Sequence, residues 1–281
     1  MDGIVIGFAA ALGALFGSFL NVVIHRLPEG KSLWWPGSAC PKCAAAIRWF
    51  DNVPVLSWLL LLGRCRNCRA PISPRYPLVE ALTAALFAAL ALLWLADRDP
   101  RQWAAFAISV PLVGALVAAS FIDFALQIIP DRITIPGMVA APVLSLLAPD
   151  FAAAEPARAA FDHLTPQGAA LLVSLFGIVA GAGSIWLVRV LGRVVFRKEA
   201  MGLGDVKFMG MIGGFLGPVG VLLAILVACF VGATVGGIGF IVTRKNTIPF
   251  GPYLAAGTLV LLFLRPEIVH FLTVTWPSLL R

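Results

Sequence analysis

Charged side chains are scarce in this chain of 281 residues. Only 12% of the residues are Asp, Glu, Lys or Arg, whereas 60% are apolar, and the mean hydropathy is +0.95. Ordinary soluble proteins carry about twice this charged fraction. The shortage excludes a water-soluble globular domain, because too few polar side chains remain to cover its surface. We therefore expect most of the surface to face lipid.

Long apolar segments separate the few charges. A membrane-spanning helix needs roughly 20 predominantly apolar residues. The stretches that meet this length are 3–25, 78–96, 103–122, 168–192 and 218–243, and weaker candidates are 133–148, 205–217 and 251–272. The pattern predicts an all-α integral membrane protein with about eight transmembrane helices. Its expected divisions are a first helix at 1–26, an insert at 27–77 and a polytopic membrane domain at 78–281.

The first apolar stretch lacks two features of a signal peptide. No basic residue follows Met1-Asp2-Gly3 before the apolar run, and no small-residue cleavage site ends it. Secretory signals carry both features. We expect this segment to be a retained transmembrane helix.

The distribution of the basic residues indicates how the chain is oriented in the membrane. The net charge of +7 would suit an acidic partner such as nucleic acid, but the charges gather between the apolar stretches. Sixteen of the 21 Lys and Arg residues fall on one predicted side of the membrane and five on the other. The side richer in Lys and Arg is normally cytoplasmic. This places the insert in the cytoplasm and both termini outside, and it argues against nucleic acid as a partner. The outer connection 149–166 is expected to be an unremarkable loop.

Four of the five cysteines form two pairs within the insert. The pairs are Cys40-Pro-Lys-Cys43 and Cys65-Arg-Asn-Cys68, with 21 residues between them. Two such turns can complete a tetrahedral zinc site, and a site of four thiolates is structural because it leaves no open position. Two disulfides or a thiol-exchange site are the alternatives. A cytosolic location keeps thiols reduced and therefore favours zinc.

Two carboxylates border the apolar stretches. Asp123 ends the run Ala-Ala-Ser-Phe-Ile-Asp, and Asp205 follows Gly202 and Gly204 just ahead of another run. An ionisable group at the edge of the hydrocarbon is costly and is by default a candidate for function. The glycines do not form a nucleotide-binding loop, because the third glycine of GxGxxG is missing and no strand precedes them.

The partner of Asp123 is expected to be Asp205. In a continuous helix Asp131 would lie roughly 12 Å from Asp123, and we expect Pro130 to end that helix and Asp131 to be the N-cap of the next. Two converging carboxylates suit hydrolysis of an amide, with an ionised one activating water and a protonated one donating to the carbonyl oxygen. An ion or proton pathway and a buried ion pair with Lys207 remain alternatives.

Several motifs resemble those of type IV prepilin peptidases, which are intramembrane aspartic proteases of the GxGD type. They are Gly-Ser-Phe-Leu-Asn-Val-Val-Ile-His-Arg-Leu-Pro at 17–28, Arg-Tyr-Pro at 75–77 with Glu80, Ile-Asp at 122–123 with Ile-Pro-Asp at 129–131, Gly-Leu-Gly-Asp-Val-Lys at 202–207 and Pro-Phe-Gly-Pro at 249–252. The resemblance runs through nearly the whole chain. It places the family's two catalytic aspartates on Asp123 and Asp205.

This resemblance implies a substrate and a second activity. The enzyme would cleave the leader of prepilins or pseudopilins at the cytoplasmic face of the bacterial inner membrane. Members with a zinc-bearing insert then methylate the new N-terminal residue with S-adenosylmethionine, and a peptidase without this activity is the alternative. Since no soluble βαβ unit is evident, the methyl donor is expected to bind between membrane helices and the insert. Glu80 is a candidate for that site, or else an ion-pair partner of Arg75.

Overall fold

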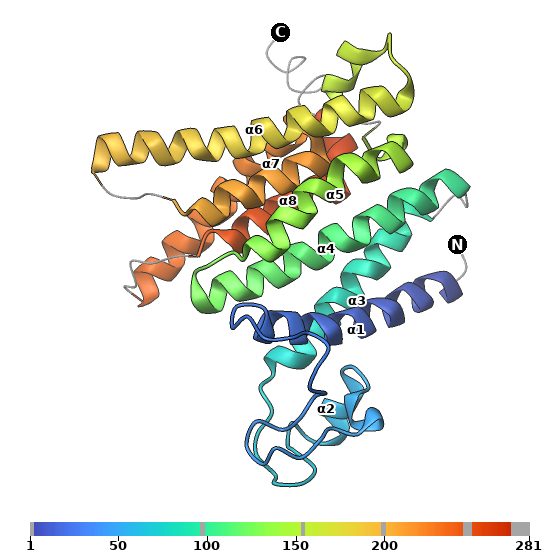
Figure 1. Ribbon diagram of the computed structural model, residues 1–281, viewed down its shortest axis with the longest axis vertical. Helices are drawn as coiled ribbons and strands as arrows, with labels where there is room; N and C mark the ends of the chain where they lie inside the picture. The colour runs from blue at the N-terminus through green and yellow to red at the C-terminus, as the bar shows by residue number, and fades with distance from the viewer. Residues whose placement is uncertain (1–2, 96–98, 153–154, 198–200, 244–248, 271–281) are drawn as a thin grey trace. The chain divides into compact units, whose positions relative to one another are not determined.

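The computed structural model describes residues 3–95, 99–152, 155–197, 201–243 and 249–270 (Figure 1). Within these ranges the structure is helical and contains no strand, which confirms the all-α prediction. The elements are α1 (Gly3–Arg26), η1 (Trp49–Asn52), α2 (Leu56–Leu60), α3 (Arg75–Trp94), α4 (Pro100–Leu126), α5 (Asp131–Leu147), η2 (Pro149–Ala152), η3 (Pro156–Phe161), α6 (Pro166–Phe196), α7 (Leu203–Thr243) and α8 (Gly251–His270). The basic residues that lie outside the described ranges are Arg98, Lys198, Arg244, Lys245 and Arg281.

The predicted spans correspond closely to these helices. Helices α1, α3, α4, α6 and α7 each contain a segment long and apolar enough to cross a membrane, and α8 contains a shorter apolar segment at Gly251–Leu264. The five strong predictions are therefore confirmed, and the chain is a multi-pass membrane protein. The weaker prediction at 133–148 falls on α5, and that at 251–272 falls on α8 except for 271–272, which lie outside the described residues. The predictions at 205–217 and 218–243 are joined in α7.

The chain divides into two compact units. The first comprises Met1–Asp99 with Ser109–Ala118, and the second comprises Pro100–Ile108 with Ala119–Arg281. In the first unit α1 packs directly on α3. A Cβ atom added to Gly17 would lie 2.7 Å from the Cα atom of Glu80. Because α1 has no side chain at this position, the two backbones approach closely, as is common between membrane helices.

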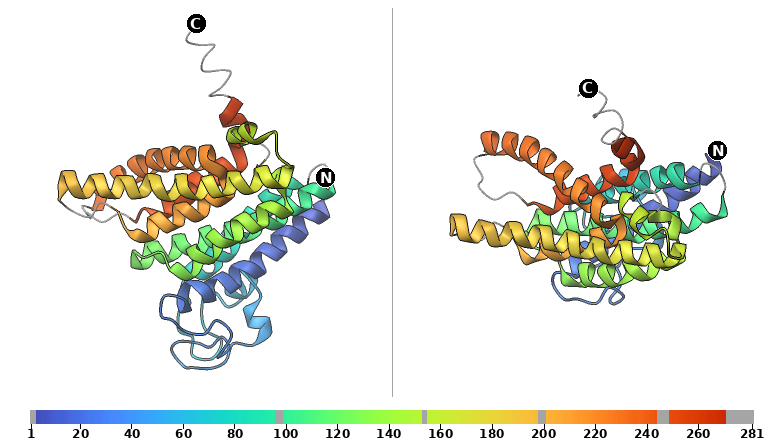
Figure 2. Two further views of the ribbon diagram at one scale, coloured as in Figure 1. Left: turned by 45° about the horizontal axis from the view of Figure 1, so that its top comes forward. Right: turned by 90° about the horizontal axis from the view of Figure 1, so that it is seen from above.

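Helix α7, in the second unit, turns back on itself at Gly217. This residue has φ 78° and ψ 175°, a conformation that is essentially restricted to glycine. A straight helix of 41 residues would be about 61 Å long. Yet Gly204 near its start packs on Ile129, and Gly251 beyond its end donates a hydrogen bond to Asp123. Gly181 of α6 packs on both Met209, before the turn, and Val221, after it, so the two segments lie side by side, and they appear as separate rods in Figure 2.

The connection before α6 fixes this turn, so the prediction of an unremarkable loop at 149–166 is wrong. Glu155 is only 2% exposed. Its carboxylate accepts backbone hydrogen bonds from Val219 at 2.8 Å and Gly220 at 3.3 Å. Pro218 opens the second segment of α7, so these N–H groups belong to the first turn of a helix and have no partner within it. Glu155 therefore caps the returning segment.

Candidate functional site

Asp123 lies in the last turn of α4 and is 6% exposed. Its Oδ2 accepts a hydrogen bond of 2.8 Å from the N–H of Gly251, the first residue of α8. Gln127 ends α4 in a left-handed conformation with φ 56°, and its N–H donates to the carbonyl of Asp123 at 2.8 Å. A helix N-terminus stabilises an adjacent carboxylate. Asp123 is therefore oriented by a segment 128 residues further along the chain.

Asp205 is the third residue of α7 and is partly exposed. Its Oδ2 accepts the N–H of Gly202 at 3.1 Å. At Gly204 a Cβ atom would lie 3.3 Å from the carbonyl oxygen of Ile129, so the absence of a side chain lets the start of α7 approach the segment that follows Asp123. Asp123 is near enough to act electrostatically on Asp205. The two aspartates therefore lie at one site in the second unit.

Asp131 is not the N-cap of α5. The helix begins at Asp131, its N-cap is Pro130 in an extended conformation, and no side chain caps it. Instead, both carboxylate oxygens of Asp131 accept hydrogen bonds from Lys207 Nζ, at 2.7 and 2.8 Å. The N-cap prediction fails because Asp131 faces a lysine on another helix. Among the described residues Lys207 pairs with Asp131, not with Asp123 or Asp205.

Gly251 was missed as a contributor to this site. A Cβ atom at this position would lie 2.7 Å from Oδ2 of Asp123. In the sequence it is evident only as part of the Pro-Phe-Gly-Pro motif. A glycine between two prolines was the available signal, because it suggests a close approach of the backbone to another group.

The four cysteines of the insert gather at one point. Their Sγ atoms all lie within 4.8 Å of one another, and those of Cys40 and Cys68 are 3.8 Å apart. Tetrahedral Zn–S bonds of about 2.3 Å would separate two sulfurs by about 3.8 Å. All four thiols are free rather than joined in disulfides. The donor set therefore fits a tetrahedral metal ion.

The two CxxC turns have the same backbone conformation. The residue after each pair, Ala44 or Arg69, has a positive φ of 56° or 60°. The N–H of the first cysteine in each turn donates to the carbonyl five residues later, at 2.9 Å for Cys40 and 2.8 Å for Cys65. The insert thus presents two equivalent knuckles that direct their sulfurs to a common centre.

The thiols interact strongly with one another. Hydrogen bonds from the backbone of Ala45 and from the Asn67 side chain lower the pKa of Cys43 to about 6. The backbone of Ala70 lowers the pKa of Cys68, but desolvation and the neighbouring thiols outweigh it and raise that pKa to about 11. One thiolate therefore disfavours the next. A bound cation would favour the thiolate form of Cys68.

Glu80 joins the insert to the helices of the first unit. It lies in α3, is 8% exposed, and its Oε2 accepts the N–H of Val55 at 2.7 Å. Val55 has φ 61°, which is strained for a β-branched residue. Among the described residues Glu80 makes no ion pair with Arg75, whose guanidinium instead lies over the ring of Tyr76.

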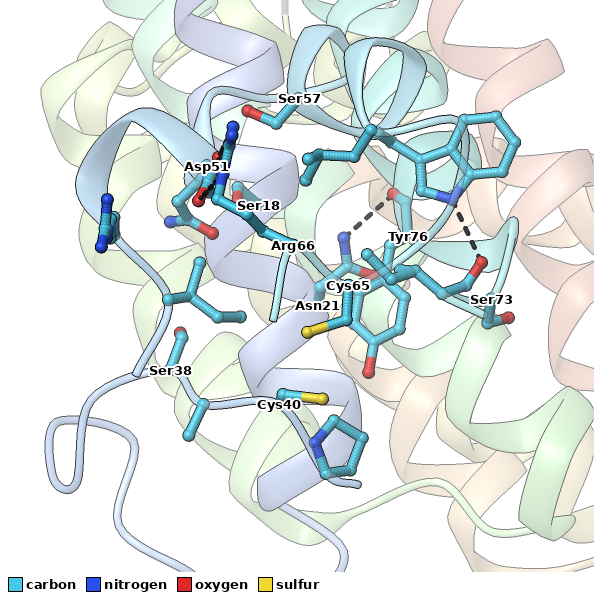
Figure 3. A pocket seen from close by; sticks show the side chains of 18 of the residues that line it. Ser18, Asn21, Ser38, Cys40, Asp51, Ser57, Cys65, Arg66, Ser73 and Tyr76 are labelled. Atoms are coloured by element: carbon cyan, nitrogen blue, oxygen red, sulfur yellow. Dashed lines mark hydrogen bonds and ion pairs between the residues drawn. The ribbon is translucent and has the colours of Figure 1, made fainter. Parts of the chain in front are cut away.

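A cavity of about 680 Å³ lies beside Glu80. Its walls come from the last turns of α1, the cysteine insert and the first turns of α3, and all of them belong to the first unit. Figure 3 shows Asn21, Tyr76, Cys40 and Cys65 among the side chains that line it. Small-molecule sites commonly have volumes of about 300–1,000 Å³. The cavity is located where the sequence placed a cofactor site, between membrane helices and the insert.

Comparison with known proteins identifies relatives along most of the chain. Residues 11–94 match the bacterial peptidase A24 N-terminal domain, and residues 110–237 match the type IV leader peptidase family. The chain is 34% identical to a prepilin leader peptidase/N-methyltransferase of Burkholderia pseudomallei, over 93% of this chain and 86% of the relative. It is 36% identical to a protein of the same name from Aeromonas salmonicida, over 89% of this chain and 87% of the relative. It is also 36% identical to a type 4 prepilin-like proteins leader peptide-processing enzyme of Escherichia coli, over 90% and 91%. No solved structure matches the chain significantly.

Proposed function

Because the chain belongs to the type IV leader peptidase family, we propose that it cleaves the leader of membrane-bound prepilins or pseudopilins and then methylates the new N-terminus. The observation that carries the peptidase activity is that Asp123 and Asp205 lie within electrostatic range of each other, while Gly204, next to Asp205, packs on Ile129 in the segment that follows Asp123. The two aspartates come from two separate motifs and two different helices. An aspartic protease needs this arrangement, because one carboxylate must activate water while the other protonates the substrate.

The two aspartates differ in their surroundings. Asp123 is buried and accepts the N–H of Gly251, which fixes one carboxylate oxygen. Asp205 is more exposed and projects from a glycine-bordered helix start. We assign to the pair the activation of one water molecule, with the ionised carboxylate taking its proton and the protonated one donating to the scissile carbonyl. Cleavage then yields a free amine on the mature protein.

Substitution of each aspartate tests the assignment. Asp123→Asn and Asp205→Asn should each reduce leader cleavage by at least about a thousandfold, since neither amide can take up a proton from water. The measurement is cleavage of a purified prepilin by the protein in detergent, with thermal unfolding as the check on folding. Asp162→Asn, at an exposed position, is the matched control. Near-normal cleavage by a folded Asp123 or Asp205 variant would exclude the proposed mechanism and favour ion transport.

We assign a structural zinc ion to Cys40, Cys43, Cys65 and Cys68. The separation of the sulfurs and the equivalence of the two knuckles support this metal. Four thiolates leave no coordination position for substrate. The role of the ion is therefore to hold the insert in the conformation that closes the 680 Å³ cavity.

The second activity requires S-adenosylmethionine, which supplies the methyl group. Glu80 is our candidate for its site, because a buried carboxylate beside a cavity of this size suits a cationic ligand. We place the protein in the bacterial inner membrane, with the insert and the active site on the cytoplasmic side. Its partners there are the prepilin or pseudopilin substrate and the surrounding lipid.

A further inference from the structure

Large apolar side chains form a stripe along one exposed face of α1. They are Ile4, Phe8, Leu12, Leu15 and Phe19, and each is at least 36% exposed. Their spacing of three or four residues keeps them on one side of a helix. Since α1 is long and apolar enough to cross a membrane, this stripe faces lipid.

The insert continues this stripe through Trp34. The indole ring of Trp34 lies beside the ring of Phe19, with the two centroids 6.3 Å apart, and Trp34 is 85% exposed. Phe19 precedes Arg26, the last residue of α1, by roughly 10 Å along the helix. The chain therefore does not lead straight away from the membrane after Arg26. It turns back along α1 toward the lipid-facing stripe.

The backbone of this loop finds hydrogen-bond partners within the first unit. Ser32 Oγ accepts the N–H groups of Trp34 and Trp35, both at 3.3 Å. The next residue is a proline, which has no N–H. The guanidinium of Arg26 donates to the carbonyls of Ser32 at 3.1 Å and Gly37 at 3.4 Å. Backbone groups close to the hydrocarbon need such partners, because water is scarce there.

The chemistry of the loop suits the apolar part of a bilayer more than a charged partner. Trp35 is 78% exposed, so two adjacent indoles project from the loop. Tryptophan is enriched at membrane–water interfaces, where the ring contacts lipid and the indole N–H reaches polar groups. Lys31, just before the loop, forms an ion pair with Glu29. Attraction of the loop to lipid would therefore not depend on anionic headgroups.

We propose that residues 33–36, the tryptophan loop, insert into the lipid leaflet nearest the insert and anchor the insert to the bilayer. The partner is the lipid surface itself, and the indoles of Trp34 and Trp35 make the contact. Cys40, a ligand of the proposed zinc site, follows the loop by four residues. The lipid contact therefore holds one end of the insert at the membrane, beside the end of α1. This anchor is independent of the two proposed enzymatic activities.

Tryptophan fluorescence of the full-length protein in phosphatidylcholine nanodiscs tests the anchor. Trp34→Phe and Trp49→Phe each remove one indole, so the difference from the wild-type spectrum gives the emission of that residue. Trp49 is the matched control, because it is 83% exposed on the same insert but adjoins Phe50, whose ring lies near the guanidinium groups of Arg48 and Arg66.

The two residues should respond to different quenchers. When the lipid is brominated on its acyl chains, the emission of Trp34 should fall by about half or more, because an interfacial indole contacts those chains. The emission of Trp49 should not change with brominated lipid, and acrylamide dissolved in the water should quench it instead. Trp35→Phe should give the same result as Trp34→Phe, and it serves as the second variant if Trp34→Phe lowers the midpoint of thermal unfolding.

Two results would overturn the proposal. If acrylamide quenches Trp34 and Trp49 equally and brominated lipid quenches neither, the loop lies in water. If brominated lipid quenches Trp34 but a saturating amount of prepilin abolishes this effect, the exposed face receives the substrate helix rather than lipid. Quenching that persists with prepilin present would support the lipid anchor.

Discussion

A single backbone N–H holds the buried aspartate of the proposed active site. Gly251 donates this bond to Asp123 at 2.8 Å, and a Cβ atom on Gly251 would lie 2.7 Å from the same carboxylate oxygen. Gly251→Ala should therefore displace the carboxylate and lower the rate of leader cleavage at least tenfold, with a small loss of stability. Gly183→Ala is the matched control, because nothing lies within 4 Å of an added Cβ there. A Gly251→Ala enzyme as fast as the control would contradict this positioning role.

The sequence predicted the two acids of the proposed site but not the groups around them. Asp123 and Asp205 stood out because charge is rare in this chain and both lie at the ends of apolar runs. The contacts of Asp131 with Lys207, and of Asp123 with Gly251, join residues 76 and 128 positions apart. Local patterns carry no information about such pairs. The N-cap prediction for Asp131 failed for this reason, since it considered only the neighbours of Asp131 in the chain.

The turn within α7 depends on a contact outside the helix. Its reversal at Gly217 places the first turn of the returning segment against Glu155. Glu155→Ala should lower the free energy of unfolding by about 1–3 kcal/mol, because two N–H groups lose their acceptor away from water. Glu155→Gln, which retains one acceptor, should lose less, and Glu267→Ala, at an exposed position, should be neutral. Thermal unfolding in detergent measures all three, and equal midpoints would exclude the cap.

The helices themselves could be predicted from the sequence, but the reversal of the chain within α7 could be predicted only in part. The predicted division at 217–218 matches the break in α7 because Gly217 and Pro218 interrupt an otherwise continuous apolar run. Nothing in that run shows that the chain reverses there. The acid that caps the turn lies over 60 residues earlier, in a connection that looked featureless because it is rich in alanine.

The insert is the element whose fold we propose to depend on a metal. Cys43→Ser and Cys68→Ser each remove one of four ligands and should reduce the zinc content from about one ion per chain to near zero. Methyl transfer should fall with it, because the insert forms a wall of the cavity. Cys229→Ser is the control, since that cysteine lies in α7 and is not one of the four in the cluster. A full complement of zinc in both ligand variants would rule out the four-cysteine site.

For the chain as a whole, the distribution of charge predicts its orientation. Eight Lys and Arg residues lie between Arg26 and Arg75, whereas the connection between α5 and α6 has only Arg158. The positive-inside rule therefore places the insert in the cytoplasm and the α5–α6 connection outside. Both contain exposed positions suitable for labelling, Lys31 and Asp162.

Cysteine labelling distinguishes the two orientations. In a background without the native cysteines outside the zinc site, Asp162→Cys should react with a membrane-impermeant maleimide in intact spheroplasts. Lys31→Cys should react only after lysis, because its side of the membrane is inaccessible to the reagent. The reverse pattern would place the insert outside, where thiols oxidise. In that case disulfides or a thiol-exchange site would be expected at the four cysteines in place of zinc. The orientation of the chain therefore decides whether the insert holds a structural metal or oxidised thiols.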